Sequence, residues 1–196
     1  MRPSILNTKR FNLVVMSRHD RPKGSGLPSD RQSHRPPRRK NVTAIAGALN
    51  LINERYLKEQ GENLKSHVEI NKELMLGMLV GGDTKAFHLT KDLMQEISGQ
   101  IKMSLQKLDA ELLITTSRRT PLAVESLLKE EFLNYRPCKL LVIANEKNIP
   151  EAVGGILALS EIIITSPESI SMISEAVNSK KYVLVFNSPN LDKKHR

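Results

Sequence analysis

The sequence contains very little cysteine and no long apolar run. Cys138 is the single cysteine among 196 residues, which excludes a disulfide framework and a zinc site built on several cysteines. No run approaches the ~20 apolar residues that a membrane-spanning helix needs, and the start lacks the apolar core of a signal peptide. We therefore expect a cytoplasmic protein in a reducing compartment, with Cys138 as a small buried residue rather than a nucleophile.

Acidic residues are scarce at the start of the chain. The formal net charge is +9, and residues 1–40 contain eleven lysines and arginines against two acidic residues. Residues 21–40 are rich in proline, glycine, serine and arginine, which predicts a disordered basic loop. Such a loop is either a solvated linker or a contact for an anionic membrane surface or nucleic acid. With four phenylalanines, three tyrosines and no tryptophan, nucleic acid is the less favoured partner.

Alternating strand and helix patterns from residue 74 onward predict an α/β fold. Strands are expected at 74–82, 110–116, 139–144, 161–165 and 182–186, and helices at 89–108, 120–132, 149–160 and 167–180. This spacing predicts a Rossmann-like, doubly wound parallel sheet with helices on both faces. The G-x-G-x-x-G fingerprint of dinucleotide-binding proteins does not occur.

The segments before residue 74 predict a smaller appendage. A short strand is expected at 11–16, and the apolar spacing of residues 41–57 predicts a helix that begins near Ala46. The expected organisation is a remnant strand in 1–20, the basic loop in 21–40, a linking helix and connector in 41–73, the Rossmann-like domain in 74–188 and a polar tail in 189–196.

Ligands of an open parallel sheet bind beyond the carboxyl ends of its strands, and small or polar residues occupy those positions here. Gly81 and Gly82 follow the first strand and can offer amides to a phosphate, although a tight turn also needs glycine. Ser117 and Arg118 follow the second strand, where an arginine can form a forked pair with a diphosphate or remain solvated. Asn148 follows the third strand.

The stretch after the fourth strand, TSPESISMISEA (165–176), combines hydroxyls with two carboxylates. Ser166 is expected to cap a helix that starts at Pro167, whose free amides and dipole form an anion site. Glu175 is expected on the polar side, where a carboxylate can accept hydrogen bonds from both hydroxyls of a ribose. Glu168 would repel a phosphate, so it either contacts ligand hydroxyls or supplies a favourable charge to the first helical turn. The residues expected to face the core are Ile170, Met172, Ile173, Ala176 and Val177.

Five segments between Phe11 and Phe186 carry a family resemblance: VVMSRHD, NVTAIAGALN, LVGGDTKAF, LITTSRRTP and ITSPESISMISEAV, in that order. Together they resemble the mitochondrial-fission (elongated mitochondria) family, whose bacterial members look like GT-B glycosyltransferases. The resemblance implies the carboxy-terminal, donor-binding domain of a GT-B enzyme, with the amino-terminal domain nearly absent. Two departures stand out: the family's Asn-Pro-Tyr after the third strand is replaced by NIPEAVG, and Glu168 stands where the family tends to have Asp.

The resemblance also implies roles for single residues. Ser169 would meet the donor diphosphate, Glu175 would hold the ribose, and Gly81, Gly82 and Arg118 match phosphate-side positions. Weaker candidates on the donor side are Ser117, Asn148, Ser166, Glu168 and Ser171.

The implied reaction is the transfer of a sugar from a nucleoside-diphosphate donor, with no metal or cofactor expected. A second chain could supply the missing amino-terminal domain. His19 and Asp20 are candidates for a general base and its orienting partner, although adjacent strand residues point to opposite faces, and a structural turn is the alternative. Two other functions stay open: a non-catalytic interaction module of the same family, and a nucleic-acid-associated protein that uses residues 21–40.

Overall fold

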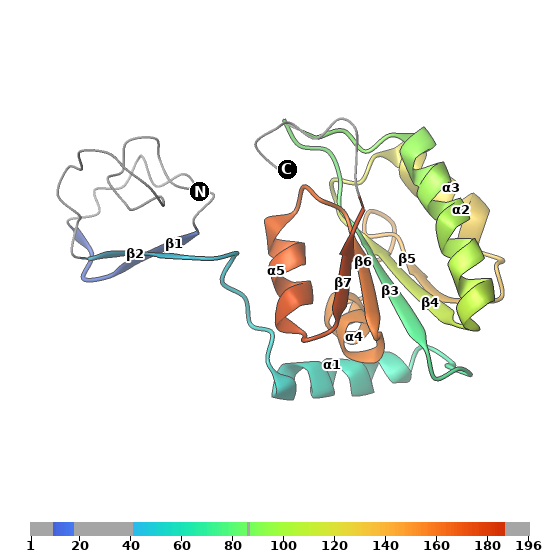
Figure 1. Cartoon of the computed structure of the whole chain (residues 1–196), viewed down its shortest axis with the longest axis horizontal. Helices are drawn as coiled ribbons and strands as arrows, with labels where there is room; N and C mark the ends of the chain where they lie inside the picture. Colours follow the sequence, from blue (N-terminus) through green and yellow to red (C-terminus); the bar gives the residue numbers. More distant parts are fainter. Residues whose placement is uncertain (1–9, 18–40, 86, 187–196) are drawn as a thin grey trace. The chain divides into compact units, whose positions relative to one another are not determined.

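The apolar runs from residue 74 onward form a parallel β-sheet in a computed structural model that describes residues 10–17, 41–85 and 87–186 (Figure 1). Its five strands are β3 (Met75–Val80), β4 (Glu111–Thr116), β5 (Cys138–Val142), β6 (Ile162–Thr165) and β7 (Tyr182–Val185), in the spatial order β5-β4-β3-β6-β7. Every residue of β3 and β4 is buried, which explains why β3 is a continuous apolar run and why β4 does not alternate between apolar and polar residues. The predicted Rossmann-like α/β fold is confirmed.

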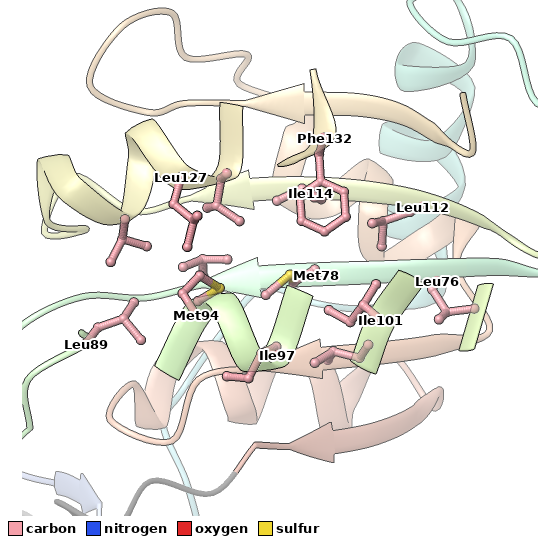
Figure 2. Close-up of a cluster of buried hydrophobic side chains, with 14 of the residues drawn as sticks. Leu76, Met78, Leu89, Met94, Ile97, Ile101, Leu112, Ile114, Leu127 and Phe132 are labelled. Atoms are coloured by element: carbon pink, nitrogen blue, oxygen red, sulfur yellow. The ribbon is translucent and has the colours of Figure 1, made fainter. Parts of the chain in front are cut away.

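Helices cover both faces of this sheet. The helices α2 (Lys91–Leu108) and α3 (Leu122–Phe132) lie on one face, and α4 (Ala152–Leu159) and α5 (Ile170–Asn178) lie on the other (Figure 1). Figure 2 shows the first face, where Met78 of β3 and Ile114 of β4 share one apolar cluster with Met94 of α2 and Phe132 of α3. The strand and helix positions predicted from residue 74 onward therefore agree with the structure to within a few residues.

The structure corrects the prediction for residues 41–73. Val42–Ile45 form the strand β2, which pairs in parallel with β1 (Val14–Ser17). Gly47 has a φ of 72°, a left-handed conformation that a helix does not contain. The helix α1 (Glu54–Lys65) begins only after its cap residue Asn53. The predicted helix start near Ala46 is therefore eight residues too early, and α1 extends to Lys65, into the part of 41–73 that was expected to be a polar connector.

The second half of α1 packs against α4 through glycines. Gly61 is buried, and a Cβ added there would lie 3.0 Å from Ala158 Cβ. A Cβ added to Gly155 would lie 2.4 Å from Leu64 Cβ. The contact face of α1 thus contains a glycine where the usual helical signal requires a large apolar residue, which explains why sequence periodicity misses it.

The chain divides into two compact units, residues 1–49 and 50–196. The predicted basic loop at 21–40 and the polar tail at 189–196 lie outside the described residues. Among the described helices, none is both long enough and apolar enough to cross a membrane.

Candidate functional site

The strand order places a topological switch point between β3 and β6. From β3 the chain continues outward to β4 and β5, and then returns to the other side of β3 to form β6 and β7. The carboxyl ends of β3 and β6 are neighbours, because Leu79 pairs with Thr165 in parallel register. In open α/β sheets the crevice at such a switch point is where ligands bind. The segments Gly81–Gly82 and Ser166–Ser169 meet at this point.

The amides of Gly81 and Gly82 are bound by oxygens of the chain itself. The Gly81 amide donates to Ser166 Oγ at 2.8 Å, and the Gly82 amide donates to Glu168 Oε1 at 2.8 Å. A Cβ added to Gly81 would lie 1.7 Å from Glu168 Oε1. These are the amides that the sequence assigns to a phosphate, and in this structure a hydroxyl and a carboxylate occupy them. We refer to Gly81, Gly82, Ser166 and Glu168 as the glycine corner.

A third segment, Ser117–Thr120 after β4, supports the glycine corner. Thr120 Oγ1 donates to the Gly81 carbonyl at 2.5 Å and accepts from the Ser117 amide at 3.0 Å. A Cβ added to Gly82 would lie 2.0 Å from the Arg119 carbonyl oxygen. Thr120 does not cap α3: its hydroxyl holds the corner, and the cap position of α3 is Pro121, which makes no side-chain cap bond.

The amino terminus of α5 lies beside the glycine corner but begins later than predicted. Its first residue is Ile170, and the cap is Ser169, whose Oγ accepts from the Met172 amide at 3.4 Å. Ser166 was expected to cap this helix; it is instead fully buried and holds the Gly81 amide. Val177, expected to face the core, is 57% exposed, whereas Ala176 is buried. Ser171 is exposed in the first turn.

Glu175 is half-buried rather than on a fully polar helix face. Burial raises the pKa of the Glu175 carboxyl above its ordinary value. Burial first, and then the charge of Glu175, raise the pKa of Tyr56 in α1, which shows that Glu175 lies near α1. Ser169 and Glu175 are separated by about 9 Å along the axis of α5 at the usual helical rise. A carboxylate that is partly desolvated is a stronger hydrogen-bond acceptor than one in bulk water.

The remaining predicted residues are not all brought together. Ser117 and the exposed Arg118 follow β4, directly beside β3. Asn148 lies in the loop after β5 (Cys138–Val142), a strand that is two positions, or about 10 Å at the usual strand spacing, from β3. His19 and Asp20 lie outside the described residues.

Sequence reasoning overlooked a histidine–aspartate pair in the loop after β3. His88 Nδ1 lies 3.3 Å from Asp83 Oδ2, and Asp83 Oδ1 accepts from the Leu89 amide at 2.9 Å. The side chains of His88 and Asp83 are 70% and 46% exposed. A solvated pair of this kind is typical of surface contacts, so its spacing of five residues carries little signal on its own.

Cys138 and the carboxylates in the described part of the chain form no metal centre. Among the described residues no group of three or more His, Cys, Asp or Glu side chains is placed to hold an ion. Cys138 is partly buried, and burial raises the pKa of its thiol to about 12, so the thiol stays protonated and unreactive at neutral pH. This agrees with the structural role predicted for it.

Comparison with known proteins places the chain in a family. The model of the family described as Mitochondrial fission ELM1 matches residues 1–196. An uncharacterized protein, RP120, from Rickettsia prowazekii (strain Madrid E) is 29% identical over 160 residues, which cover 79% of this chain and 43% of that protein. The chain thus spans less than half the length of this relative. Because the family model covers every residue, the chain belongs to the mitochondrial fission ELM1 family.

Proposed function

We propose that residues 74–186 bind a nucleoside-diphosphate sugar as the donor domain of a GT-B-type glycosyltransferase. The observation that carries this proposal is the switch point between β3 and β6, where the glycine corner and the start of α5 meet. Phosphate groups favour such positions because glycine amides and helix amino termini present hydrogen-bond donors to anions. The reaction would transfer the sugar from the diphosphate to an acceptor hydroxyl.

Under this proposal each polar group near the switch point has a role. Ser169 and the first turn of α5 bind the diphosphate, with the exposed Arg118 as a counter-charge. Glu175 accepts hydrogen bonds from the ribose hydroxyls, about 9 Å farther along the helix. This distance suits a nucleotide that lies along α5 with its diphosphate at the helix start. A second chain or a further domain would supply the acceptor side, since the chain covers 43% of its relative.

The test is calorimetric titration of UDP, GDP, ADP and CDP against the wild type and Glu175→Gln. We expect one nucleotide to bind the wild type and the variant to bind it more weakly by about 1–3 kcal/mol, because a charged acceptor for two hydroxyls is lost. Glu130→Gln is the matched control, since Glu130 is exposed on α3 and its replacement removes the same charge. Thermal melts of all three proteins verify that the fold is retained.

Three results would count against the proposal. If no nucleotide binds the wild type up to millimolar concentration, the donor-site function is wrong. If Glu175→Gln binds as tightly as wild type, the ribose role of Glu175 is wrong. Equal weakening in Glu175→Gln and Glu130→Gln would show an effect of net charge alone.

A second function, a non-catalytic interaction module, is favoured by one specific observation. The Gly81 and Gly82 amides already have partners within the chain, so the corner is stable without a ligand. In that case the family fold would serve as a scaffold, and the same titrations would show no nucleotide binding while the melts show a folded protein.

A further inference from the structure

The carboxylate of Glu168 is unusual because only one of its two oxygens has a partner. Oε1 accepts from the Gly82 amide at 2.8 Å. Oε2 is buried and has no hydrogen-bond partner among the residues that the structure describes. A buried carboxylate oxygen without a donor loses its hydration and receives nothing in exchange, which is unfavourable. The contact of Glu168 with Gly82 therefore has an unfavourable free-energy term from the unpaired Oε2, and this term disappears when Glu168 leaves the glycine corner.

The Gly82 amide explains why a carboxylate is there at all. Buried backbone amides require a partner, and Gly82 is buried at the end of β3. The Arg119 backbone packs closely against this residue, since a Cβ added to Gly82 would lie 2.0 Å from the Arg119 carbonyl oxygen. An anion is the strongest partner for such an amide, and Glu168 supplies one from within the chain.

We propose that Glu168 is a built-in competitor for the phosphate of the ligand: it occupies the Gly82 amide in the free protein and leaves when a phosphate binds there. This inference rests on the proposed donor function. A phosphate oxygen and the Glu168 carboxylate cannot share one amide, and their like charges repel each other. Binding thus exchanges one anion for another at Gly82, and the released Oε2 regains water. Glu168 lowers the affinity for the ligand and protects the empty corner.

The test compares inorganic pyrophosphate and the nucleoside diphosphates as ligands of the wild type, Glu168→Ala, Glu168→Gln and the control Glu130→Gln. Glu168→Ala frees the Gly82 amide and removes the charge, so we expect both ligands to bind about tenfold more tightly or better. Glu168→Gln keeps an oxygen that can hold the amide but loses the charge, so its gain is smaller. Glu130→Gln removes an exposed charge elsewhere and should show no gain.

Amide NMR locates the effect. In ¹⁵N–¹H spectra of Glu168→Ala, pyrophosphate should shift the Gly82 amide strongly. If Glu168→Ala is unstable but Glu168→Gln is not, the competition is still tested by whether Glu168→Gln binds the ligand more tightly than the wild type. Unchanged or weaker binding in both Glu168 variants would overturn the proposal and make Glu168 a structural or ligand-holding residue.

The outcomes separate this inference from the donor function. Nucleotide binding by the wild type with no gain in the Glu168 variants overturns the competition but keeps the donor site. Pyrophosphate binding by Glu168→Ala without nucleotide binding by the wild type keeps the competition and overturns the donor function. An absence of binding in all four proteins overturns both.

Discussion

Replacing Gly82 by alanine tests whether the glycine corner is fixed by close backbone contact. The added Cβ would lie 2.0 Å from the Arg119 carbonyl oxygen and 2.5 Å from the Thr120 amide nitrogen. Both obstacles are backbone atoms, so the Ser117–Thr120 segment must move by about 1.4 Å to reach an ordinary contact distance of 3.4 Å. Overpacking of this kind costs about 1–3 kcal/mol. The hydrogen bonds from the Asp83 amide to Arg119 and from Thr120 Oγ1 to Gly81 add about 1 kcal/mol each if they break.

The expected loss for Gly82→Ala is therefore about 2–5 kcal/mol in the free energy of unfolding, measured by urea denaturation. Gly81→Ala should cost less, because its nearest obstacles, Glu168 Oε1 at 1.7 Å and Ser166 Oγ at 2.5 Å, are side-chain atoms, which shift more readily than backbone. Gly99→Ala is the control: Gly99 lies inside α2 with no atom within 4 Å of an added Cβ. This change should stabilise the protein by about 0.5–1 kcal/mol through helix propensity.

The ranking is the decisive result. A Gly82→Ala protein within about 0.5 kcal/mol of wild type, alongside a stabilised Gly99→Ala, would refute the argument that the two loops meet backbone to backbone. If Gly81→Ala lowers the free energy of unfolding more than Gly82→Ala does, the Glu168 side chain is held rigidly in place, although its Oε2 has no hydrogen-bond partner in the described structure.

Two further predictions concern charge. Burial alone would raise the pKa of Glu111, but the amides of Asn71 and Lys72 and the ammonium of Lys139 outweigh it and lower that pKa below 4.5. The contribution of the ionised Glu111 to stability is therefore present above pH 4.5 and is lost as pH falls through the lowered pKa. The free energies of unfolding of wild type and Glu111→Gln, measured by urea denaturation, should therefore converge in acid. A difference between them that stays constant with pH would contradict this. For the basic segment 21–40, any binding to anionic vesicles or DNA should weaken steeply as salt rises, and binding that salt leaves unchanged would show a different kind of contact.

The strands were predictable because their signal is local. β3 and β4 are buried on both faces, so β3 is an uninterrupted apolar run and β4 has an apolar centre at Leu112–Ile114, and length and composition identify both. The shared edge of Gly82 and Ser169 follows from parallel strand direction alone. These features require no knowledge of which residues touch across the fold.

The caps and loop contacts were not predictable from sequence, because distant residues decide them. Ser166 followed by Pro167 resembles a helix start as closely as Ser169 does. What distinguishes them is the Gly81 amide, which is 85 positions away in sequence and takes the Ser166 hydroxyl. The sequence likewise favours Glu168 as a charge in the first turn of a helix that starts at Pro167, whereas the structure shows its carboxylate bound to the Gly82 amide. Parallel strand direction thus predicted that the candidate residues share one sheet edge, while the partners of the Gly81 and Gly82 amides depended on tertiary structure.

The contact between α1 and α4 has a consequence for how the chain folds during its synthesis. Leu64 and Gly155 touch although 91 positions separate them, so α1 leaves the ribosome long before its partner exists. During that interval the part of Leu64 that packs against Gly155 is uncovered. Contacts of such wide sequence separation slow folding and lengthen the exposure of apolar surface. A nascent chain that stops before residue 152 would hold α1 as an uncovered amphipathic helix, a form that chaperones bind and that aggregates readily.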